Sequence, residues 1–133
     1  IAGQLPARAL VLATQAETLG PPLPHTPGLP RAAPVKDSFA LSIRQTLLPL
    51  AETAGFPVLL IHGDFHTYIV DQPFRNLRSA LIRNLWRLEV FGEPRLHAVR
   101  VRIQPAGSQP PFEFTPIWNP MSTDPRSRPR PPR

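Results

Sequence analysis

The chain has 133 residues, about the length of one domain, with 20 prolines and a formal net charge of +6. It contains no cysteine, which excludes a disulfide framework and thiolate metal sites. The sequence contains no run of about 18 apolar residues, so it predicts no membrane span, and no signal-peptide pattern is visible. Because the first residue is Ile1 rather than Met, we expect the sequence to begin inside a longer product.

Proline and positive charge are concentrated in two segments. Prolines crowd residues 21–34 and 105–133, and the end of the chain, STDPRSRPRPPR, carries four arginines against one aspartate. We therefore predict a partial domain over 1–118, containing a proline-rich loop at 21–36, and a disordered tail over 119–133. A basic tail can hold nucleic acid or another anionic polymer by charge alone, although a solvated terminus without a partner is the favoured interpretation.

The first half of the chain predicts a strand, a helix and a second strand. RALVLATQA (8–16) is typical of a short buried strand. After the proline-rich loop, Asp37 or Ser38 is expected to cap a helix, which Gly55 and Pro57 end and which Pro49 kinks or shortens. PVLLIHG (57–63) predicts a strand buried on both faces, which makes a parallel crossover unit and an α/β class. The helix presents an apolar stripe at spacings of three and four, formed by Phe39, Ile43, Leu47 and Leu50.

The second half predicts an antiparallel meander in the same domain. Residues 84–92 and 96–104 alternate in polarity, and the short GEPR link between them is typical of a hairpin. FEFTPIW (112–118) predicts a third strand, placed at an edge because Pro116 cannot donate a ladder hydrogen bond.

Three ionisable residues follow the buried strand at alternate positions: His62, Asp64 and His66. In an extended segment they point to one side, and imidazole and carboxylate are ligands for Zn²⁺, Mn²⁺ or Fe²⁺. Plain strand-end polarity is the alternative, with Asp64 accepting backbone amides in the turn. An oxyanion loop of an α/β serine hydrolase is a third interpretation, but it needs a G-x-S-x-G elbow that the sequence lacks. His25 and His97 have weaker claims, and His97 is expected to be a core histidine.

Four segments of the chain resemble the C-terminal half of bacterial calcineurin-like metallophosphoesterases. They are RALVLATQA, PVLLIHGDFHTYIVDQPF, NLWRLEVFGEPRLHAVRVRIQP and FEFTPIW, which span roughly residues 8–118. The resemblance is closest to a subgroup in which the last metal motif is written H-G-D-x-H. Gln15 falls where that subgroup carries Q-A-D before a variable loop.

The resemblance implies a four-layer α/β/β/α sandwich that holds two divalent metal ions (Mn, Fe or Zn) and hydrolyses a phosphate mono- or diester. It implies that His66 is a metal ligand, that Asp64 is a ligand or orients one, and that His62 has a catalytic role in lining the site or contacting the substrate.

The family's upstream D-x-H, G-D and G-N-H-[DE] motifs do not precede this block in the sequence. We therefore expect a fragment with little or no activity of its own. The rival hypothesis is a non-enzymatic anion-binding module that uses the tail and the face carrying Arg100 and Arg102.

Overall fold

The computed structural model describes residues 8–19, 35–63, 65–93 and 97–122. His25, Asp64, most of the proline-rich loop and residues 123–133 of the predicted tail lie outside these residues. The elements in chain order are β1 (Leu10–Ala13), η1 (Asp37–Phe39), η2 (Ala40–Leu47), α1 (Leu48–Thr53), β2 (Val58–His62), β3 (Ile69–Asp71), β4 (Leu85–Glu89), β5 (Ala98–Ile103) and β6 (Phe112–Ile117).

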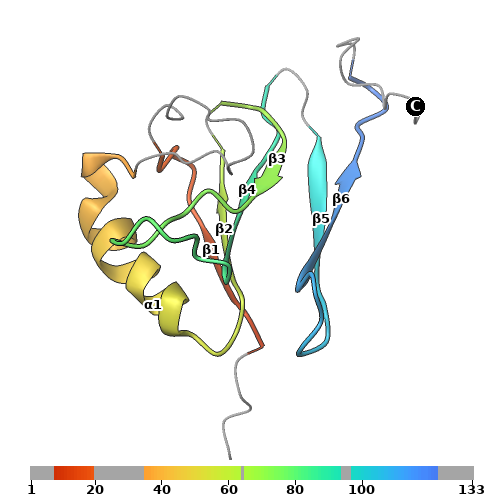
Figure 1. Cartoon of the computed structure of the whole chain (residues 1–133). Coiled ribbons are helices and arrows are strands. Elements are labelled where there is room, and N and C mark those ends of the chain that lie inside the picture. The colour runs from red at the N-terminus through yellow and green to blue at the C-terminus, as the bar shows by residue number, and fades with distance from the viewer. Residues whose placement is uncertain (1–7, 20–34, 64, 94–96, 123–133) are drawn as a thin grey trace, which may run out of the picture.

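The main sheet has four strands in the order β1-β2-β4-β3 (Figure 1). β2 pairs in parallel with both β1 and β4, while β3 is antiparallel to β4. The predicted strand–helix–strand crossover is confirmed, since β1 and β2 are parallel and the helical segment lies between them in the chain. The prediction that β2 is buried is also confirmed, because Val58, Leu59 and Leu60 are almost fully covered.

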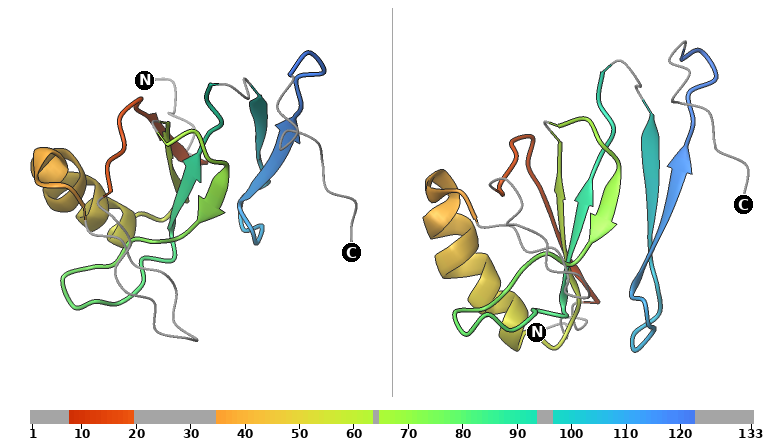
Figure 2. Two further views of the ribbon diagram at one scale, coloured as in Figure 1. Left: turned by 90° about the horizontal axis from the view of Figure 1, so that it is seen from above. Right: turned by 45° about the horizontal axis from the view of Figure 1, so that its top comes forward.

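The helical segment runs from Asp37 to Thr53 and covers one face of this sheet (Figure 2). Its middle part, η2, has the wider π-helical spacing, with the Leu48 N–H bonding to the Ile43 carbonyl just before Pro49, which has no N–H to donate. No side chain caps its N-terminus, so the predicted cap at Asp37 or Ser38 is wrong.

Asn84 ends the helix from across the fold. Its amide nitrogen donates to the carbonyls of Ala51, Ala54 and Phe56 at 3.2, 3.0 and 2.6 Å. The predicted left-handed stop at Gly55 is wrong, because Ala54 is extended and, among the described glycines, only Gly107 has a positive φ. A long-range side chain thus satisfies the free carbonyls that a local glycine cap satisfies elsewhere.

Two further expectations about strands are wrong. Within the part of the chain that the structure describes, β1 is an edge strand, and Val11 and Leu12 are exposed rather than buried. β4 and β5 do not form a hairpin: β4 lies between β2 and β3, and β5 pairs with β6 in a separate two-stranded antiparallel sheet. The alternating polarity of residues 84–92 and 96–104 is the same whether the two strands pair in a hairpin or lie in different sheets, because each strand buries one apolar face in both cases.

The two sheets face each other, so the described residues form a helix layer, a four-stranded sheet and a two-stranded sheet (Figures 1 and 2). Leu59, Leu88 and Phe112 fill the space between the sheets, and a second cluster that includes Ile43, Leu47, Val58 and Leu85 fills the space under the helix. The α/β class is confirmed. Among the described residues β6 pairs with β5 alone, which agrees with the edge position that Pro116 predicts. Within the described residues, no helix is long and apolar enough to cross a bilayer.

Candidate metal-binding site at the carboxyl ends of the parallel strands

Three buried ionisable residues meet where the parallel strands end. His62 is the last residue of β2, Glu89 is the last residue of β4, and the two are partners in the parallel register. Glu17 lies in the segment that follows β1. Because parallel strands start and finish at the same edges of a sheet, their final residues come together, and the carboxyl edge is where α/β sheets place their sites.

These residues form a compact group that could hold a metal ion. One ligand atom from each of Glu17, His62 and Glu89 lies within 4.8 Å of the other two. His62 Nδ1 is 3.5 Å from Glu17 Oε2. Two of the side chains, Glu17 and Glu89, are 2% exposed, and His62 is not exposed at all. We refer to these three residues as the buried cluster.

Backbone groups orient the buried cluster. The Leu19 N–H donates to Glu17 Oε1 at 2.7 Å, and the Thr67 N–H donates to Glu89 Oε1 at 3.4 Å. His62 Nδ1 lies 3.1 Å from the Gly63 carbonyl oxygen. Since a carbonyl oxygen only accepts, Nδ1 carries the hydrogen and Nε2 is left with a lone pair in the neutral ring. Nε2 is buried and has no partner in the described residues.

The charges of the buried cluster are only partly offset by its neighbours. Arg87 donates to both carboxylate oxygens of Asp71, with Nε 2.7 Å from Oδ1, and so is engaged between β3 and β4. Burial raises the pKa of Glu89 above its ordinary 4.5, and Glu17 raises it further, while His62, the Thr67 N–H and Arg87 act in the opposite direction. Two carboxylates beside one imidazole in a place without solvent require a proton or a cation.

His66 lies on the same stretch of chain but is exposed. Its backbone has a φ of 57°, in the left-handed region that is uncommon for residues other than glycine. Nδ1 lies 2.7 Å from the Glu93 carbonyl oxygen, so Nδ1 carries the hydrogen and Nε2 has the lone pair of the neutral ring. The ring lies against Gly92, where a Cβ atom would come within 2.2 Å of its Cδ2.

The predicted site residues therefore have different environments. His62 belongs to the buried cluster, and His66 is not a member of it. Asp64 lies outside the described residues, so its predicted metal role stays a prediction, as do the catalytic role of His62 and the metal role of His66. His97 is a core histidine, as expected: Nδ1 accepts from the Asn119 N–H at 3.0 Å, and the ring packs edge-on against Phe91 and Trp118.

Sequence reasoning missed Glu17 and Glu89. A signal for Glu89 was present, because both buried parallel strands, VLLIH and LWRLE, end in an ionisable residue. Treating residues 84–92 as one arm of a hairpin removed the reason to pair those two strand ends. Glu17 gave no comparable signal, since it lies in an irregular segment.

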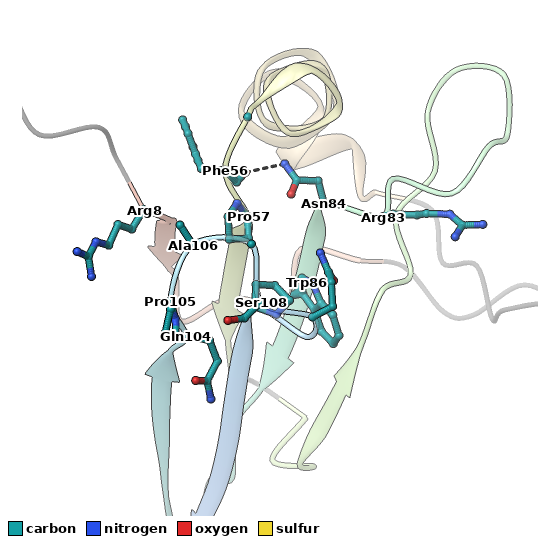
Figure 3. Close-up of a pocket in the computed structure, with 14 residues that line it drawn as sticks. Arg8, Phe56, Pro57, Arg83, Asn84, Trp86, Gln104, Pro105, Ala106 and Ser108 are labelled. Atoms are coloured by element: carbon teal, nitrogen blue, oxygen red, sulfur yellow. Dashed lines mark hydrogen bonds between the residues drawn. The ribbon is translucent and has the colours of Figure 1, made fainter.

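The opposite end of the sheet has a hollow of about 170 Å³ near Trp86 and the turn at 104–109. Its two arginines, Arg8 and Arg83, extend to opposite sides rather than toward each other (Figure 3). It therefore lacks the convergent ionisable groups that the carboxyl edge has. Arg100 and Arg102 are exposed on β5, as the alternation predicts, with Arg102 3.6 Å from Glu113.

Comparison of the chain with models of protein families, with curated proteins and with solved structures gives no match.

Proposed function

We propose that this chain carries part of the active site of a metal-dependent phosphoester hydrolase, at the carboxyl edge of its four-stranded sheet. Two features support the proposal: the resemblance of the 57–74 block to the last metal motif of calcineurin-like phosphoesterases, and the environment of His66. The mixed α/β fold with two facing sheets is compatible with the C-terminal part of the four-layer sandwich that this resemblance implies.

The observation that carries the proposal is the contact of His66 Nδ1 with the Glu93 carbonyl oxygen at 2.7 Å. Histidines that bind metals almost always donate their other ring N–H to a carbonyl or carboxylate, as Nδ1 of His66 does to Glu93. Nε2 has no partner in the described residues, and the side chain is exposed, so it is available to an ion or to a substrate. Left-handed backbone at a non-glycine residue costs free energy and concentrates at functional sites.

In this proposal His66 holds a divalent metal ion, and Asp64 is the second ligand or orients one. Metal ions at such sites polarise the phosphoryl oxygens and lower the pKa of bound water. The chain's own contribution is to fix the imidazole, through the Gly92 contact and the Glu93 carbonyl, at the edge of the fold. The parallel strands beneath it supply a rigid platform.

The 133-residue chain alone is expected to hydrolyse phosphoesters weakly or not at all. The D-x-H and G-N-H-[DE] motifs that supply the other ligands in the resembling family do not precede the 57–74 block. Rapid Mn²⁺-dependent turnover of p-nitrophenyl phosphate or of its bis-ester by the purified chain, lost with a chelator, would contradict this expectation while supporting the reaction class.

A test of the metal role does not need turnover. Paramagnetic Mn²⁺ should broaden the ring NMR resonances of His66 at low metal ratios, and inorganic phosphate should bind only when metal is present. His66→Ala should abolish metal-dependent phosphate binding. Because His97 is enclosed by Phe91 and Trp118, its resonances serve as an internal control. Unbroadened His66 resonances at saturating Mn²⁺ would refute the proposal.

A further inference from the structure

We propose that Glu17, His62 and Glu89 form a second, closed cation site that holds one divalent transition-metal ion inside the fold, with a structural rather than a catalytic role. This site is separate from the exposed imidazole of His66 and does not depend on the proposed phosphoester chemistry.

Burial comes first. None of the three side chains has more than 2% of its surface exposed. Structural metal sites are closed by protein ligands, whereas catalytic sites keep one position open for water or substrate. An ion bound to these three side chains is therefore enclosed by the described residues and cannot contact a substrate. Its effect falls on the segments that carry the donors: the chain after β1 and the ends of β2 and β4.

Charge selects a divalent ion. With both carboxylates ionised, even a protonated His62 leaves the buried cluster with a negative charge, and Arg87 is already paired with Asp71. A divalent cation with a neutral imidazole brings the net charge to zero. Uncompensated charge in such a place is strongly unfavourable, which is why buried charges in proteins are paired or coordinate metals.

Two buried polar atoms in or next to the buried cluster have no hydrogen-bond partner among the described residues. They are His62 Nε2 and Thr18 Oγ1, in the residue after Glu17; the core residue His97 also has a buried Nε2 without a partner. A folded protein rarely leaves such atoms unsatisfied unless an ion or a water molecule completes the site. The donation of His62 Nδ1 to a backbone carbonyl is also the usual second contact of a metal-binding histidine.

The types of donor atom narrow the choice of metal ion. Two carboxylate oxygens and one imidazole nitrogen suit Zn²⁺, Mn²⁺ or Fe²⁺, whereas Ca²⁺ and Mg²⁺ prefer oxygen donors alone. Zn²⁺ in a closed site takes four ligands, a number that three residues reach when one carboxylate binds through both oxygens. We therefore choose Zn²⁺ as the probe, with Mg²⁺ as the comparison.

The experiment measures bound metal and thermal stability in the full chain after removal of metal with a chelator. Zn²⁺ at about 100 times its dissociation constant should raise the unfolding midpoint by roughly 10 °C, and Mg²⁺ should not. Glu89→Gln, which keeps the shape of the side chain, should bind one equivalent of zinc fewer than the wild type and lose this rise. Glu52→Gln, at an exposed carboxylate of α1, is the matched control and should behave as the wild type.

His66→Ala separates this proposal from the proposed function. It removes the exposed imidazole and should leave the zinc-dependent rise intact, whereas loss of the rise in this variant would place the ion at His66 and overturn the closed site. Retention of the full zinc content by Glu89→Gln would overturn it as well. If zinc does not stabilise the wild type at all, the closed metal site is refuted, and shared protons satisfy the two carboxylates instead.

One measurement requires no variant. Paramagnetic Co²⁺ bound in the buried cluster should shift the ring NMR resonances of His62 strongly in the wild-type chain. Resonances of His62 that stay in place at saturating Co²⁺ would refute the closed site even if Glu89→Gln failed to fold.

Discussion

At the scale of single residues, the contact between Gly92 and His66 explains why one small residue controls an exposed side chain. A Cβ atom at position 92 would lie 2.2 to 2.7 Å from three atoms of the imidazole ring, so the ring and an alanine side chain cannot both keep their places. The ring would have to leave the Glu93 carbonyl, and the neutral tautomer that leaves Nε2 free would no longer be fixed.

We therefore predict that Gly92→Ala lowers metal affinity at His66 by about 10- to 100-fold, the range found when an orienting partner of a ligand is lost. The measurement is an NMR titration of the His66 ring with Mn²⁺. Gly55→Ala is the control, because a Cβ atom there meets nothing within 4 Å. Unchanged affinity in Gly92→Ala would show that the contact does not position the ring.

Glu89 gives a prediction about pH. Its pKa is raised above 4.5, chiefly by burial. Between pH 4.5 and the raised value, the folded chain keeps a proton that the unfolded chain has lost, so the free energy of unfolding falls as pH rises through this window. In the presence of a chelator, Glu89→Gln should gain stability over the wild type from pH 4.5 toward neutrality. Urea unfolding at several pH values measures this gain, and a gain that shrinks as pH rises would contradict it.

At the scale of secondary-structure elements, the end of α1 depends on Asn84, the residue just before β4. One amide serves three carbonyls that the helix and the following turn leave free. This contact also connects the helix layer to the sheet, because residue 84 leads directly into the strand that lies beside β2 (Figure 3).

Asn84→Ala should lower the free energy of unfolding by about 1–3 kcal/mol, since it leaves partly buried carbonyls without a donor. Chemical denaturation measures the change. Gln45→Ala removes an exposed amide in η2 that bonds to no described residue, and should change the free energy by less than about 0.5 kcal/mol. Equal effects of the two substitutions would argue against a capping role for Asn84.

The sequence was informative where a pattern depends on local chemistry. The apolar run 57–61 predicted β2 and its burial, and Pro116 predicted an edge strand. It was less informative where distant partners decide the outcome. Gly55 carries the local signal of a helix stop, but Asn84 provides the stop. RALVLATQA is apolar enough for a central strand, yet only β2 pairs with β1 in the described residues.

The predicted and the missed residues of the candidate site differ in how far apart they lie in the sequence. His62 and His66 were identified because they lie close together in one segment. Glu17 and Glu89 were missed because their proximity to His62 depends on which strands pair and in which register. A single sequence states neither.

At the scale of the whole molecule, the protection of the backbone should follow the sheet order. β2 is paired on both sides and lies between the helix and the second sheet, whereas β6 is paired only with β5 among the described residues. Amides of β2 and β4 should therefore exchange most slowly with solvent, and those of β1 and β6 faster. Hydrogen-exchange NMR measures these rates. Exchange in β6 as slow as in β2 would indicate a partner on its open edge.

The pairing of His62 with Glu89 in neighbouring parallel strands also has a kinetic consequence. The residues of the buried cluster are distant in the sequence, and their side chains meet only after the loops before β2 and β4 have closed. Non-local contacts of this kind form slowly, because chain entropy is lost before the contact is gained. A one-residue slip between β2 and β4 would send the two side chains to opposite faces. The meeting of imidazole and carboxylates thus marks the moment in folding at which the correct strand register has been reached.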